Sequence, residues 1–290
     1  MSTTSPTLNE IRLEIDSVDD AVHDLLMRRC QLVEAAGHIA AGGGLVRPGR
    51  EAMIMRRLIA RHHGNFPVPV LARMWREMVS GLNWLQGPLA VAVYAPEDRR
   101  GFWDIARDHY GSQVPMFAVN TAIAAVRAVA EGTATVAVVP CPEDDDGEPW
   151  WPALMGDDGK VPRVTARLPF CGRGNARGDD RDALALSRQG HDPTGDDRTL
   201  LAIELSQDMS RGRLKDALEG AGMKPVAFRS PMIAERGGRS LHLVEVADYI
   251  DAGSPDLARL RQRTGDLLQY LIPIGGYAVP IAMTKDPRKS

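Results

Sequence analysis

Residues 8–36, LNEIRLEIDSVDDAVHDLLMRRCQLVEAA, decide the fold of the first part of the chain. Apolar side chains recur along them every three or four positions, which is the spacing of one face of an α-helix. The members of this apolar stripe are Leu8, Ile11, Ile15, Val18, Val22, Leu25, Leu32 and Ala36. Thr7 and Glu10 have capping-box spacing at its start, and Gly42-Gly43-Gly44 ends it. The pattern predicts one helix of about 35 residues and about 50 Å, too long for a small monomeric bundle.

Two more helices follow the glycines. One begins after Arg47-Pro48-Gly49 and is expected to turn Ile54, Leu58 and Ile59 inward. The other runs from about 70 to 86. Its expected inward residues are Leu71, Met74, Met78, Leu82 and Leu85. Residues 1–87 are therefore predicted to form an all-α domain of three helices.

The pattern changes at Gly87-Pro88. Continuous apolar runs at 89–95 and 135–139 predict strands buried on both faces, and helical stretches near 102–109 and 122–130 alternate with them. Periodicity then fades, with short candidate strands at 163–168 and 183–187, and Trp150-Trp151 is expected to pack this loop region down. Residues 88–197 are predicted to form a reduced α/β domain.

A third domain is predicted for residues 198–290. Its expected elements are a strand at 199–205, a helix at 210–221, strands at 225–229 and 241–246, a helix at 255–271 and a strand at 273–279. This β-α-β-β-α-β order is typical of ferredoxin-like α+β domains.

Composition limits the class of protein. The 290 residues are 44% apolar and 25% charged, with a net charge of −3. These values exclude a disordered or collagen-like chain and argue against nucleic acid as the main partner. No run approaches the roughly 18 apolar residues of a membrane span, and residues 1–20 do not resemble a signal peptide, so we expect a cytoplasmic protein. Three cysteines without zinc-site or disulfide spacing predict no metal site.

Three polar side chains interrupt the apolar faces. Arg29 lies in the stripe of the first helix, and Glu51 and Gln86 lie on the expected inward faces of the second and third. A buried guanidinium is costly without a partner, so Arg29 must meet an internal carboxylate or a bound anion. For each residue alone, a buried Arg29–Glu51 ion pair with Gln86 as a bystander is favoured. Together, the three favour a polar pocket inside the bundle, where small molecules bind.

Arg12 lies beside the stripe, seventeen residues before Arg29, which is about 25 Å along one helix. A small metabolite cannot span that distance. If both arginines bind one anion, they come from two chains, and antiparallel pairing of two such helices would bring them together. The alternative is a surface arginine paired with Asp16.

Residues 8–86 resemble the all-helical chorismate mutases. The motifs that carry the resemblance are Leu8-Asn-Glu-Ile-Arg12-Leu-Glu-Ile-Asp16-Ser-Val-Asp19, Leu25-Leu-Met-Arg-Arg29, Arg47-Pro-Gly-Arg50-Glu51 and Leu85-Gln86. The resemblance implies an intertwined homodimer that rearranges chorismate to prephenate without a cofactor. It implies that Arg12 reaches across the interface, that Arg29 grips a substrate carboxylate and that Arg50 supports the carboxylate side. It also implies that Glu51 accepts a hydrogen bond from the ring hydroxyl and that Gln86 donates one to the ether oxygen.

The chain departs from this family at one important position. The family has a lysine eleven residues after the position of Arg29, and this chain has Ala40 there. Loss of one preorganised donor typically costs two to three orders of magnitude in rate, so a slow or substrate-shifted mutase is expected. Leu82 replaces the family's serine. Arg47 replaces an acidic residue, and it is a candidate for the missing cation.

The order of the three domains resembles that of the bifunctional chorismate mutase–prephenate dehydratases. Residues 132–140 are similar to a dehydratase strand, and residues 275–280, with Tyr277, are similar to the last strand of the regulatory ACT domain. The dehydratase motifs are missing, because residues 141–147 replace Glu-Asn-Ser and residues 175–178 lack the catalytic threonine. The resemblance therefore implies a degenerate dehydratase-like domain.

A partial match to the family's ligand motif implies that the ACT-like domain senses an aromatic amino acid. The candidate effector-binding residues are Phe228, Arg229 and Ser230. Two other functions stay open. One is a non-catalytic regulator that binds chorismate or an amino acid, and the other is an active bifunctional mutase–dehydratase.

Overall fold

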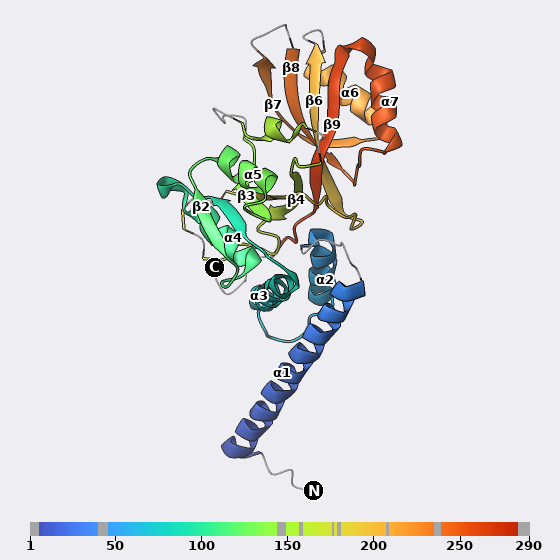
Figure 1. Ribbon diagram of the computed structural model, residues 1–290. Coiled ribbons are helices and arrows are strands. Elements are labelled where there is room, and N and C mark those ends of the chain that lie inside the picture. The colour runs from blue at the N-terminus through green and yellow to red at the C-terminus, as the bar shows by residue number, and fades with distance from the viewer. Residues whose placement is uncertain are drawn as a thin grey trace.

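The computed structural model describes residues 6–39, 46–143, 149–156, 159–175, 177–178, 181–206, 209–234 and 239–283. Three helices at the N-terminus are followed by a nine-stranded sheet with helices packed on it (Figure 1). No described helix is both long enough and apolar enough to cross a membrane.

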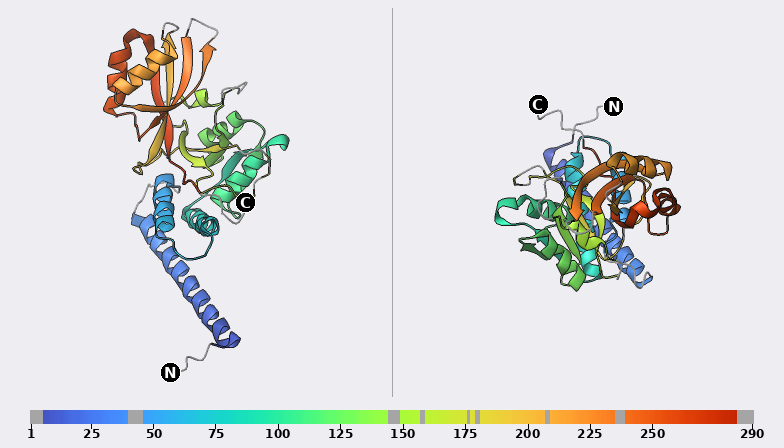
Figure 2. Two further views of the ribbon diagram at one scale, coloured as in Figure 1. Left: turned by 180° about the vertical axis from the view of Figure 1, so that it is seen from behind. Right: turned by 90° about the horizontal axis from the view of Figure 1, so that it is seen from above.

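The three predicted helices are confirmed as α1 (Leu8–Ile39), α2 (Pro48–Ala60) and α3 (Val68–Gln86). The capping box forms, since the Thr7 amide donates to Glu10 Oε2 at 2.7 Å and the Glu10 amide donates to Thr7 Oγ1 at 3.3 Å. Most of α1 projects away from the rest of the chain (Figures 1 and 2), so its apolar stripe is exposed along most of its length.

The middle of the chain forms α4 (Gly101–Tyr110), α5 (Ala122–Glu131) and five strands. The strands are β1 (Val91–Tyr94), β2 (Met116–Val119), β3 (Val136–Pro140), β4 (Arg163–Leu168) and β5 (Ala183–Ser187). β1 is parallel to β2 and β3, whereas β5 is antiparallel to β3 and β4. Alternate side chains of β1 and β3 pack toward α5 and toward α4, which explains why these strands read as continuous apolar runs.

The last part of the chain follows the predicted β-α-β-β-α-β order. Its elements are β6 (Asp197–Ser206), α6 (Arg211–Gly220), β7 (Lys224–Ala234), β8 (Arg239–Ala247), α7 (Pro255–Thr264) and β9 (Leu268–Ala278). Among the described residues, short 3₁₀ turns also occur in the middle part of the chain, at Glu97–Arg99 and Trp151–Leu154, and after α7, at Gly265–Leu267. The predicted helix to residue 271 is wrong. α7 stops at Gly265, which has a φ of 54° that favours glycine, and residues 268–271 start β9 instead.

One continuous sheet carries both parts, in the order β2-β1-β3-β5-β4-β9-β6-β8-β7. The two parts meet where Val164 of β4 pairs with Gly275 of β9. A Cβ atom at Gly275 would collide with the backbone of Val164, so this junction requires glycine.

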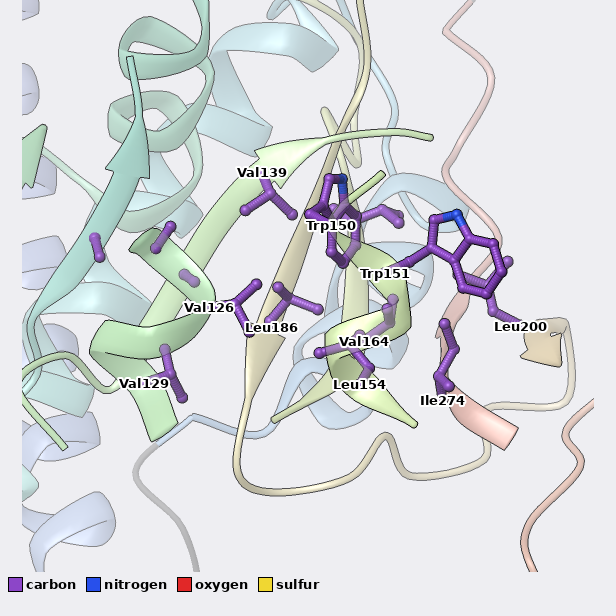
Figure 3. Close-up of a cluster of buried hydrophobic side chains, with 14 of the residues drawn as sticks. Val126, Val129, Val139, Trp150, Trp151, Leu154, Val164, Leu186, Leu200 and Ile274 are labelled. Atoms are coloured by element: carbon purple, nitrogen blue, oxygen red, sulfur yellow. The ribbon is translucent and has the colours of Figure 1, made fainter. Parts of the chain in front are cut away.

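Trp150 and Trp151 lie in the buried cluster that fills the space beside this junction (Figure 3). The cluster draws Leu186 from β5, Leu200 from β6 and Ile274 from β9. The prediction that the tryptophans pack their loop down is confirmed.

Helices α2 and α3 pack against residues that follow β4 and against the C-terminal end of β9. Ala52 and Met55 of α2 and Ala72 of α3 share a small core with Phe170 and Ala278. Hydrogen bonds reinforce this core, since the Arg56 guanidinium donates to Thr194 Oγ1 at 2.9 Å and to the carbonyl oxygens of Asp196 and Val279 at 2.8 and 2.9 Å. The C-terminal end of β9 and the loop before β6 therefore hold α2 directly.

Candidate active site in the helical unit

Glu51 lies in the first turn of α2 and is only 8% exposed. Its carboxylate accepts hydrogen bonds from Arg76 Nη1 at 2.8 Å and from Asn83 Nδ2 at 2.9 Å, and both donors belong to α3. The alternative interpretation, an ion pair between Glu51 and Arg29, is wrong, because the cation beside Glu51 is Arg76. A carboxylate has about four acceptor sites, so Glu51 retains capacity for a further donor.

Arg29 is half-buried on α1. Its Nη1 atom is buried and has no hydrogen-bond partner, and burial lowers the pKa of the guanidinium. No carboxylate of the described residues forms an ion pair with Arg29. Within the described residues Arg29 therefore lacks the internal carboxylate partner that the sequence allowed, and its Nη1 is available to a bound anion.

Gln86 lies at the end of α3, where α3 contacts α1. Its Oε1 would lie 3.8 Å from a Cβ atom at Gly37, two turns after Arg29 on α1. Its Nε2 donates to the Leu82 carbonyl at 3.4 Å, a weak bond within its own helix, and the side chain is exposed. The amide is therefore free to turn toward a ligand at the α1–α3 contact.

The remaining predicted arginines are exposed. Arg12 forms no ion pair with Asp16, and its separation from Arg29 along α1 prevents both from reaching one small ligand within a protomer. Arg47 Nη2 lies 3.5 Å from Asp192 Oδ2. Arg50 makes no ion pair within the described part, and Ala40 lies outside the described residues.

The prediction of which residues of α2 and α3 face inward is partly wrong. Ile54, Leu58 and Ile59 are only half-buried, and Met74 and Leu85 are exposed. The buried members of α3 are Ala72, Arg76, Val79, Ser80 and Leu82. Because Arg76 and Ser80 are polar, an apolar-stripe criterion missed the face that packs against α2 and α4. Their four-residue spacing from Ala72 was the available signal.

A second polar cluster lies in the sheet, on both sides of the β4–β9 junction. The Tyr277 hydroxyl donates to Glu245 Oε1 at 2.8 Å and accepts from Arg167 Nη1 at 3.1 Å. Arg167 also donates to Asp182 Oδ2 through Nε and Nη2, at 3.0 and 2.8 Å. The network is therefore internally satisfied and holds the two parts of the sheet together.

Of the candidate effector residues, Arg229 lines a small cavity beside this network with Cys141 and Glu245. Burial raises the pKa of the Cys141 thiol to about 12, so this cysteine is an unreactive thiol. Phe228 lies under the Arg211 guanidinium, 5.1 Å from ring centroid to Cζ. The Ser230 side chain lies outside the described part. Within that part, no cluster of three or more His, Cys, Asp or Glu residues could hold a metal ion.

Residues 11–86 match the family model described as chorismate mutase type II. This match covers α1 from its first turn to the end of α3, and so includes every candidate residue of the helical unit. The N-terminal part of the chain is thus a helical chorismate mutase domain, and a mixed α/β sheet follows it.

Curated relatives match beyond this domain. A bifunctional chorismate mutase/prephenate dehydratase of Pseudomonas aeruginosa is 30% identical over 151 residues, which are 48% of this chain and 40% of the relative. The protein of the same name from Stutzerimonas stutzeri is 28% identical over 150 residues, with the same two coverages. The chain therefore spans about two fifths of the length of these relatives.

Solved structures of low identity also align. The prephenate dehydratase of Arthrobacter aurescens in complex with L-Phe covers 70% of this chain and 94% of its own, at 13% identity and a TM-score of 0.48. The prephenate dehydratase of Streptococcus mutans covers 67% of this chain and all of its own, at 14% identity and a TM-score of 0.45.

Proposed function

We propose that this protein is a chorismate mutase, which rearranges chorismate to prephenate in the synthesis of phenylalanine and tyrosine. The observation that carries the proposal is the buried, unpaired Nη1 of Arg29 in a helical unit that matches chorismate mutase type II. A guanidinium donor without a protein partner is suited to a carboxylate ligand, and chorismate carries two carboxylates.

The reaction fits the residue types present. A Claisen rearrangement needs no nucleophile, metal or proton transfer, only a dianion held in a chair-like pose and donors at the ether oxygen. In this proposal Arg29, with support from Arg50, binds a carboxylate. Glu51 accepts from the ring hydroxyl and Gln86 donates to the ether oxygen, where negative charge develops in the transition state.

We further propose a homodimer in which α1 pairs with α1 of a second copy. An apolar stripe of this length on a projecting helix is typical of an interaction surface. Its exposed members are Leu8, Ile11, Ile15, Val18, Val22, Leu25 and Leu32. Antiparallel pairing would cover this stripe and bring Arg12 of one protomer toward Arg29 of its partner.

The alanine at position 40 predicts slow turnover, because one preorganised cation is absent. Arg47, the residue that precedes α2, is our candidate for a replacement cation. In that case Arg47→Ala lowers turnover further, whereas unchanged turnover removes Arg47 from the site.

For the rest of the chain we propose an inactive dehydratase-like domain at 88–197 and an ACT-like domain at 198–290. The missing Glu-Asn-Ser and threonine motifs support the first assignment, and the β-α-β-β-α-β order supports the second. The effector of the ACT-like domain would be an aromatic amino acid that binds near Phe228, Arg229 and Ser230.

Loss of chorismate, followed by ultraviolet absorbance, tests the mutase assignment. The wild type should consume chorismate and form prephenate, and Arg29→Ala should not. A wild type no faster than buffer would favour the rival function, a non-catalytic regulator. Supplied prephenate should yield no phenylpyruvate, and its formation would restore the bifunctional alternative.

A further inference from the structure

Arg76 is the least exposed charged residue of α3, with 6% of its surface accessible. Its Nη1 donates to Glu51 Oε2, and its Cζ lies 5.3 Å from the centroid of the Phe170 ring. Its Nε is buried without a hydrogen-bond partner. The guanidinium therefore lies between the carboxylate of α2 and an aromatic ring of the sheet part.

A buried ion pair of this kind is a poor way to gain stability. Taking both charges out of water costs about as much as their attraction returns, and apolar side chains of similar volume often stabilise a core better. The unpaired Nε adds a further cost. Stability therefore does not explain the burial of Arg76. Its hydrogen bond to the Glu51 carboxylate suggests that it orients this group.

Arg76 and Asn83 hold the two oxygens of Glu51 from two turns of the same helix. Arg76 takes Oε2 and Asn83 takes Oε1, so rotation of the carboxylate would break both bonds. The carboxylate plane is fixed, and the acceptor sites that these donors leave unused point in fixed directions.

We infer that Arg76 is a positioning residue of the mutase site, which acts through Glu51 by fixing the carboxylate that receives the substrate's ring hydroxyl. The inference rests on the proposed function. The guanidinium that binds Glu51 also lies against the ring of Phe170, which belongs to the sheet part of the chain.

Arg76→Gln tests the inference, and Arg73→Gln is its matched control. Arg73 lies on the same helix and also forms an ion pair, with Asp108, but does not contact Glu51. We expect Arg76→Gln to lower kcat/KM for chorismate about 10- to 100-fold and Arg73→Gln to change it less than about twofold. Arg76→Lys, which keeps the charge but not the planar fork, should recover part of the loss.

A double-mutant cycle identifies the residue through which Arg76 acts. In a Glu51→Gln background, Arg76→Gln should cost less than about threefold, because the carboxylate to be positioned is gone. If Arg76→Gln does not fold, Asn83→Ala takes its place in the same cycle. We then expect Asn83→Ala to lower kcat/KM about three- to tenfold when Glu51 is present and to have little effect when Glu51 is replaced by Gln.

The outcomes separate this inference from the proposed function. An inactive wild type overturns both. If the wild type is active, two results overturn only the positioning role. One is that Arg76→Gln and Arg73→Gln lower kcat/KM equally, and the other is that Arg76→Gln lowers it equally with Glu51 and with Gln at position 51.

Discussion

Arg29→Met removes a guanidinium whose Nη1 is buried without a partner, while the apolar stem of the side chain is retained. The substitution should therefore affect the stability and the activity of the protein in opposite directions. A fully buried unsatisfied donor costs about 1–3 kcal/mol. Because the rest of Arg29 reaches solvent, we expect the variant to be more stable by no more than about 1 kcal/mol.

The expected loss of activity is much larger. A charge-assisted hydrogen bond contributes about 1.5–3 kcal/mol, and a guanidinium that binds a carboxylate with two parallel bonds contributes at least about 3 kcal/mol. That free energy corresponds to a loss of about 150-fold in kcat/KM.

Denaturant unfolding and chorismate consumption measure the two quantities on the same samples. Arg28→Met is the matched control, because Arg28 is an exposed arginine next to Arg29 on α1, and it should change neither quantity appreciably. An Arg29→Met variant that is clearly less stable than wild type would show that Arg29 is a structural residue, and one that turns over chorismate normally would show that Arg29 does not bind the substrate.

Three more changes have defined outcomes. Leu25→Glu, in the exposed stripe of α1, should shift the mass measured by light scattering toward the monomer and lower the turnover, whereas an unchanged mass argues against α1 pairing. Burial, aided by the nearby Arg76, holds the pKa of His109 well below 6.5 in the folded protein. As the pH falls, the unfolded chain therefore binds a proton at His109 before the folded protein does. As the pH drops below about 6.5, the free energy of unfolding should decrease by up to about 1.4 kcal/mol per pH unit, and His109→Gln should remove this contribution to the slope. Tyr277→Phe deprives Arg167 and Glu245 of a shared hydroxyl and should lower the free energy of unfolding by about 1–3 kcal/mol, whereas a loss below about 0.5 kcal/mol would mean that the network contributes little.

Local patterns predicted most of the elements, because they depend on neighbours in the chain. The capping box of α1 and the bounds of β4 and β5 follow from such patterns. β2 was missed, because its four residues form an edge strand that pairs only with β1 and carries no recognisable alternation. The start of β9 was missed because a helical pattern continued across Gly265.

The candidate site was predictable only in part. Glu51 was recognised as a polar residue on an inward face, but its partners were not, since Arg76 is buried by Phe170, which is 94 residues further along the chain. The four-residue spacing of Ala72, Arg76 and Ser80 indicates a shared face of α3, but it does not indicate which distant segment buries that face. The length of the apolar stripe of α1 indicated a helix too long for a small monomeric bundle, and we propose that a second copy covers this stripe.

Mixing two inactive variants tests most directly whether the site joins arginines from two protomers. Arg12→Ala and Arg29→Ala proteins are each measured alone, then unfolded together in equal amounts and refolded. Random pairing makes half of the dimers mixed, and each mixed dimer regains one site with both arginines, so about a quarter of wild-type turnover should return. Turnover that stays at the level of the separate variants would contradict the shared site.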